Sequence, residues 1–111
     1  MQKVVITGHD LTVDQIIAVC REGAEVVLSD ESREKILASR QVVNELVEER
    51  KVVYGITTGF GKFSDVVISQ DECKLLQKNL IITHAVGAGD PFKEDIARGI
   101  LLLRVNSLSN G

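Results

Sequence analysis

The sequence predicts a helix-rich α+β protein in which short N-terminal strands are combined with about four helices. Two runs rich in β-branched residues, at 4–6 and 25–28, are typical of short strands. Most of the remaining chain carries apolar residues at helical spacing, interrupted by glycine and proline. The 111 residues carry a net charge of −3, which suits a single small acidic domain over residues 1–111.

The first part of the chain is predicted to form a β-α-β motif. A helix over residues 13–21 would connect the two strands, with Thr12 as its N-cap and Asp14 in its first turn. Gly23 is a suitable residue to end this helix.

A second helix is expected over residues 30–50, because its apolar residues share one face. These residues are Ile36, Val43, Leu46 and Val47. The 15 residues that follow at 54–68 contain three glycines and no helical pattern. A compact domain seldom keeps so long a loop without a use, so this segment is a candidate functional site.

Two further helices are predicted in the C-terminal half. Ser69 and Glu72 form a capping-box pattern that starts a helix over residues 70–86. Asp90 and Pro91 then suit the N-cap and first position of a helix over residues 92–108.

The last helix, 92–108, is apolar on two faces. One face carries Ile96, Ile100 and Leu103, and the other carries Leu101, Val105 and Leu108. A 111-residue domain has too few neighbouring elements to cover both faces. We therefore expect a second subunit, or a further part of a longer polypeptide that continues after residue 111, to cover the rest.

Composition and spacing argue against several functions. The acidic balance does not suit a basic nucleic-acid-binding module. The longest uncharged stretch, 79–89, is too short for a membrane span, and the N-terminus lacks the apolar region of a signal peptide, so a cytoplasmic location is expected. No metal site is expected from the spacing of the two histidines and two cysteines, and Cys20 and Cys73 are interpreted as buried free thiols.

The glycine-rich segment 54–62 does not match the common phosphate-binding loops. A Walker A motif ending at Lys62 would need glycine in place of Ile56 and serine or threonine in place of Phe63. A dinucleotide-binding fingerprint would need a third glycine at position 64.

Tyr54 and His84 are the two side chains in these segments that could carry chemistry. Tyr54 is the only tyrosine and precedes Gly55, so its phenol sits beside a flexible backbone position. A phenol is a poor base at neutral pH unless its neighbours stabilise the phenolate. Spacing alone leaves open whether Tyr54 is a base or a packing residue, and whether His84 is functional or a partly buried core histidine.

Three segments carry a family resemblance. Residues 54–61 (YGITTGFG), 79–87 (NLIITHAVG) and 104–111 (RVNSLSNG) resemble the N-terminal part of the histidine ammonia-lyases, a branch of the aromatic amino acid lyase family. The pair Thr83-His84 is similar to the Ser-His pair of the histidine branch, whereas the tyrosine and phenylalanine enzymes typically carry His-Leu or Phe-Leu there. The resemblance covers essentially the whole chain.

The resemblance implies an enzyme that eliminates ammonia from L-histidine to give trans-urocanate, in histidine degradation. The reaction would use a methylidene-imidazolone that forms from an Ala-Ser-Gly tripeptide. Tyr54 would accept the β-proton and His84 would position the substrate imidazole. The active-site loop would comprise Gly55, Thr58, Gly59, Phe60 and Gly61. The family fold is mostly helical, of the aspartase/fumarase type, and assembles as a homotetramer.

The sequence contains no Ala-Ser-Gly, since Ala38-Ser39 is followed by Arg40. We therefore expect an N-terminal fragment of a longer lyase that is inactive by itself and holds no cofactor, with its last helix leading into a helical bundle. The alternatives are a fragment of a phenylalanine or tyrosine ammonia-lyase or aminomutase, and a stand-alone interaction module without catalytic activity.

Overall fold

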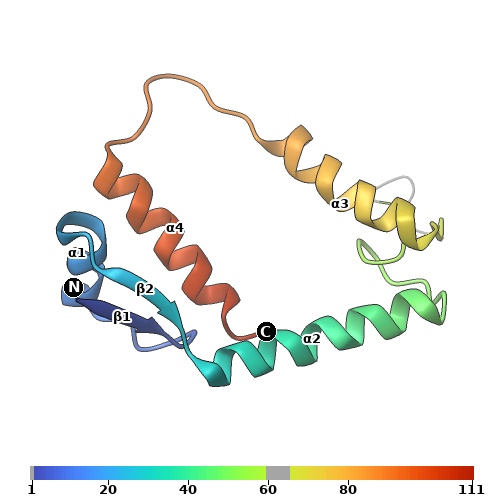
Figure 1. The fold of residues 1–111 in the computed structure, drawn as a ribbon. Coiled ribbons are helices and arrows are strands. Elements are labelled where there is room, and N and C mark those ends of the chain that lie inside the picture. The colour runs from blue at the N-terminus through green and yellow to red at the C-terminus, as the bar shows by residue number, and fades with distance from the viewer. Residues whose placement is uncertain (1, 60–65) are drawn as a thin grey trace. The chain divides into compact units, whose positions relative to one another are not determined.

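The computed structural model describes residues 2–59 and 66–111, and it confirms the helix-rich α+β class (Figure 1). The elements, in chain order, are β1 (Lys3–Ile6), α1 (Val13–Glu22), β2 (Glu25–Leu28), α2 (Asp30–Glu48), α3 (Gln70–His84) and α4 (Glu94–Leu108). The chain forms two compact units, one of Met1–Arg40 with Asp90–Gly111 and the other of Gln41–Gly89. None of the described helices is long and apolar enough to cross a bilayer.

The predicted β-α-β motif is confirmed in the first unit. β1 and β2 pair in parallel, with Val4 opposite Val26, and α1 makes the connection between them. Thr12 and Gln15 form a capping box at the start of α1, since each side chain accepts a hydrogen bond from the backbone N–H of the other residue. Gly23 ends the helix with a φ of +73°.

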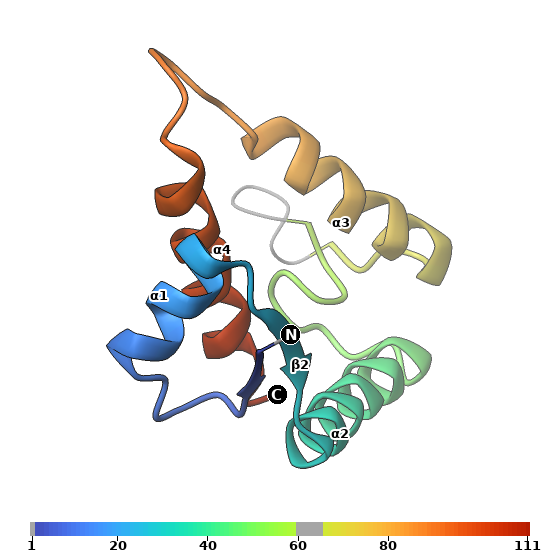
Figure 2. The ribbon, with the colours of Figure 1, turned by 60° about the vertical axis from the view of Figure 1, so that its left-hand side comes forward.

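The core of the first unit is small and aliphatic. It is made of Val4, Ile6, Ala18, Val19, Ala24 and Leu102. Helix α4 lies against α1 (Figure 2). It contributes Leu102, which is 4 % exposed, to this cluster. Because most of these side chains are small, the unit depends on close contact between α1 and α4.

The start of α4 was predicted wrongly. The helix begins at Glu94, not at residue 92, and its N-cap is Lys93, which makes no side-chain capping bond. Asp90 lies in a bend instead of capping the helix. The first turn is held by a long-range contact that local sequence cannot reveal, between Arg21 Nε and Asp95 Oδ2 at 3.3 Å.

The two apolar faces predicted for the last helix stay exposed in this chain. Leu101 is 66 % exposed and Leu108 is 59 % exposed, and the other residues of the two faces are also at the surface. A groove of about 420 Å³ lies beside α4, with Val19, Val26 and Leu101 among its lining residues. Leu102 of α4 therefore packs in the core, whereas most apolar side chains of the helix are exposed.

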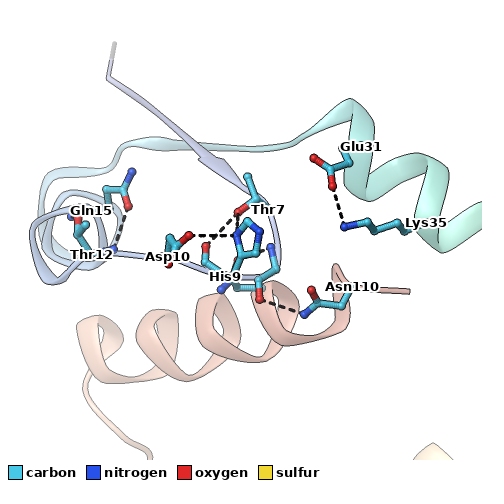
Figure 3. Close-up of polar contacts among 10 residues, drawn as sticks. Thr7, His9, Asp10, Thr12, Gln15, Glu31, Lys35 and Asn110 are labelled. Carbon is cyan, nitrogen blue, oxygen red and sulfur yellow. Dashed lines mark hydrogen bonds and ion pairs between the residues drawn. The ribbon is translucent and has the colours of Figure 1, made fainter.

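The C-terminal residues hold the connection between β1 and α1 at Gly8. Asn106 Oδ1 accepts a hydrogen bond from the Gly8 N–H at 3.0 Å, and Asn110 Nδ2 donates to the Gly8 carbonyl at 3.0 Å (Figure 3). Gly8 has a φ of +92°, and a Cβ there would come within 2.4 Å of Asn110 Oδ1. Only glycine fits this clamp.

We expect Asn106→Ala to destabilise the 111-residue chain by about 1–3 kcal/mol, because the Gly8 N–H loses its acceptor at a site where Asn106 is buried. The measurement is the free energy of unfolding in urea. Ser107→Ala is the matched control, since the exposed Ser107 hydroxyl donates to the Arg104 carbonyl of its own helix. Equal stability of both variants would contradict the clamp.

Candidate active site

Helix α3 is the framework of the candidate site in the second unit. The predicted capping box is confirmed: Ser69 Oγ accepts from the Glu72 N–H at 3.3 Å, and Glu72 Oε2 accepts from the Ser69 N–H at 3.0 Å. The helix ends at His84, two residues earlier than predicted. Ala85 adopts an extended conformation there, which stops the helix before the glycines at 87 and 89.

His84 is exposed, so the expectation of a partly buried core histidine was wrong. Its ring folds back along its own helix, and Nδ1 lies 2.9 Å from the Leu80 carbonyl oxygen. Nδ1 also lies 3.2 Å from Thr83 Oγ1. In the tautomer in which Nδ1 donates to the Leu80 carbonyl, Nε2 is a hydrogen-bond acceptor. Thr83 Oγ1 donates to the same carbonyl at 3.2 Å.

The segment after Tyr54 is a tight turn held by two buried threonines. Thr57 and Thr58 are 1 % and 0 % exposed. The Thr57 hydroxyl accepts from the Val53 N–H at 2.9 Å and donates to the Lys51 carbonyl. Thr58 Oγ1 accepts from the Gly55 N–H at 3.3 Å. These bonds satisfy buried polar groups and fix the path of the loop around Tyr54.

Gly55 is the residue that allows this turn, because its φ is +70°. Its carbonyl accepts a hydrogen bond from Gln77 Nε2 of α3 at 2.9 Å. The Tyr54 loop is therefore fastened to the helix that ends at His84. Tyr54 itself is 61 % exposed, so its ring lies at the surface of this chain.

The structure places five of the expected site residues in the second unit and leaves two outside its description. Those placed are Tyr54, Gly55, Thr58, Gly59 and His84, whereas Phe60 and Gly61 lie outside the described residues. Sequence reasoning missed Thr57 and Gln77. The seven-residue spacing of Gln77 and His84, which puts both on one helix face, was the available signal for Gln77.

Metal ligands do not gather in the part of the chain that the structure describes, where no three His, Cys, Asp or Glu side chains come together. Cys73 is buried, as expected, but Cys20 is only half-buried. Gly99 of α4 faces the Cys20 sulfur, and the absence of a side chain at Gly99 leaves Cys20 partly open.

The second unit thus holds an exposed phenol beside a glycine turn that is hydrogen-bonded to α3, and an exposed imidazole at the end of the same helix. The model of the aromatic amino acid lyases matches residues 11–111, so the chain belongs to the aromatic amino acid lyase family. It is 56 % identical over its whole length to a histidine ammonia-lyase of Alkaliphilus oremlandii, covering 22 % of that protein.

Two solved structures resemble the chain closely. The histidine ammonia-lyase of Trypanosoma cruzi matches with a TM-score of 0.89 and 39 % identity, over 99 % of this chain and 21 % of that one. A tyrosine aminomutase of Streptomyces globisporus matches with a TM-score of 0.87 and 35 % identity, over 98 % of this chain and 21 % of that one. The chain thus spans about a fifth of the length of its relatives.

We expect the capping box of α3 to be measurable through Glu72. Hydrogen bonds from the Ser69 backbone N–H and then from its hydroxyl lower the pKa of Glu72 below its ordinary value of 4.5. Because the folded-state pKa is lowered, the stabilisation is present above pH 4.5 and is lost as the pH falls through the lowered value.

Ser69→Ala removes the hydroxyl, so the Glu72 pKa should rise toward 4.5 in an NMR titration of its side-chain carboxyl carbon. Thr12→Ala, which removes the equivalent cap of α1, is the control and should leave the Glu72 titration unchanged. A Glu72 pKa that is the same in the wild type and in Ser69→Ala would show that the hydroxyl does not contribute.

Proposed function

We propose that this chain is the N-terminal part of a histidine ammonia-lyase, which converts L-histidine to trans-urocanate and ammonia. The fixed ring of His84 is the observation that carries the proposal. With Nδ1 donating to the Leu80 carbonyl 2.9 Å away, Nε2 would accept a hydrogen bond from an N–H group. The imidazole of histidine has such a group, whereas the phenyl ring of phenylalanine has none.

Tyr54 is proposed as the base of this reaction. As phenolate, its oxygen would take a proton from the substrate β-carbon, the electron pair of that C–H bond would form the Cα=Cβ double bond, and the Cα–N bond would break to release ammonia. The β-proton is weakly acidic, so a strong base at a fixed position is needed. The loop residues Gly55, Thr58 and Gly59 supply this fixed position.

The methylidene-imidazolone implied by the family supplies an electrophile when bound. It forms from Ala-Ser-Gly, and the 111 residues contain no such tripeptide, so they do not make this group themselves. We propose that a part of the enzyme outside this chain provides the group and that the isolated chain does not turn over histidine. We also propose a homotetramer, as the family resemblance implies, and a cytoplasmic location, as expected from the sequence.

The test is an assay of the full-length protein containing this segment with L-histidine, L-phenylalanine and L-tyrosine as separate substrates. We expect formation of urocanate from L-histidine and little product from the other two. The isolated 111-residue chain is the control and should produce none. Preferential use of tyrosine or phenylalanine would support the other branches, and full-length protein inactive on all three would support an interaction module.

Tyr54→Phe in the full-length protein should lower kcat by about 10²–10⁴-fold, because the β-proton loses its acceptor while the ring remains. Phenylalanine keeps the aromatic ring, so the thermal unfolding midpoint should change by no more than a few degrees. Steady-state kinetics and thermal unfolding are the two measurements. A variant with a near-normal kcat would remove Tyr54 from the mechanism.

A further inference from the structure

We propose that Gln77 is a positioning residue that fixes the Tyr54 phenol for proton abstraction, acting through the carbonyl of Gly55. The inference rests on the proposed function, because it assigns Tyr54 the role of base. Its direct basis is the hydrogen bond from Gln77 Nε2 to the Gly55 carbonyl oxygen, at 2.9 Å.

Gly55 is the point at which the direction of Tyr54 is set. Glycine has more backbone freedom than any other residue. Gly55 directly follows the tyrosine and has a φ of +70°. Thr58 Oγ1 holds its N–H at 3.3 Å, and Gln77 holds its carbonyl. Both peptide groups that flank the Gly55 Cα are therefore hydrogen-bonded. The backbone at Gly55 cannot rotate without breaking one of these bonds.

The two bonds differ in what they depend on. Thr58 is fully buried and belongs to the turn itself, so its bond forms whenever the loop folds. Gln77 is exposed and comes from α3, so its bond ties the loop to a separate element. Loss of the Gln77 amide should leave the turn folded, but the turn would no longer be held in one orientation relative to α3.

Helix α3 also carries His84, seven residues after Gln77. That spacing is close to two helical turns, so the two side chains share a helix face about 10 Å apart along the axis. One rigid helix would thus fix the positions of both the proposed base and the group that would hold the substrate imidazole. A displacement of about 1 Å between such groups can cost about 10²-fold in rate.

The test uses the full-length lyase with Gln77→Met, which keeps the length of the side chain and removes its donor. We expect kcat for L-histidine to fall by about 10–100-fold and KM to change by less than about threefold. The kinetic isotope effect with β-deuterated histidine should rise, because proton transfer becomes slower relative to the other steps. Gln41→Met is the matched control, since the side chain of Gln41 donates to the nearby Glu45 of α2.

Gln77→Glu is the second variant, in case the methionine side chain impairs folding. An ionised carboxylate cannot donate to the Gly55 carbonyl, so kcat should again fall and the isotope effect should again rise. Amide hydrogen exchange over residues 53–58 should become faster. A lower melting temperature with unchanged kcat and isotope effect in the folded variants would overturn the proposal. If the wild-type enzyme does not convert histidine, the proposed function fails instead, and the exchange measurement still tests the contact.

Discussion

The candidate site depends on the buried hydroxyl groups of Thr57 and Thr58. A loop that contains several glycines has a high conformational entropy, and ordering it requires interactions that exceed this cost. The two threonines provide them, because each is almost completely buried and bonds backbone groups of the loop or of the residues just before it. Their burial matters, since a hydroxyl that left these partners would be an unpaired polar group in the interior. Tyr54 can therefore lie at the surface while its backbone is fixed.

Helix α3 connects this loop to the second group of the site. Its start is stabilised by the reciprocal bonds of Ser69 and Glu72, and its last residue is His84, whose ring is held by the Leu80 carbonyl. The helix is exposed over most of its length, with Cys73 as its buried residue, and its N-terminal cap contributes about 1 kcal/mol. The geometry of the imidazole and of the Gln77 contact thus depends on the local chemistry of one helix.

The sequence predicted the features that arise from neighbouring residues. The Ser69–Glu72 capping box, the Thr12 N-cap, the β-branched strands and the helix end at Gly23 involve residues within a few positions of one another, so composition and spacing identify them. Contacts between distant residues could not be predicted in this way. Arg21 pairs with Asp95, 74 positions away, and Gln77 bonds the Gly55 carbonyl, 22 positions away. The tyrosine was recognisable from the family motif, but the residue that fastens its loop was not.

The apolar faces of α4 are left uncovered by the small core of the first unit. A 15-residue helix is marginal in water and is stabilised mainly by packing of its apolar side chains. Here Leu102 is packed, whereas Ile100, Leu101 and Leu103 are exposed to water. Each side chain of this size contributes about 1.5–3 kcal/mol when fully buried. Burial of these exposed side chains together would therefore stabilise α4 more than the burial of Leu102 alone does. This favours a protein in which further polypeptide covers α4. The proposed role of Tyr54 would need the same cover, because proton abstraction by a phenolate is favoured in a site that excludes water.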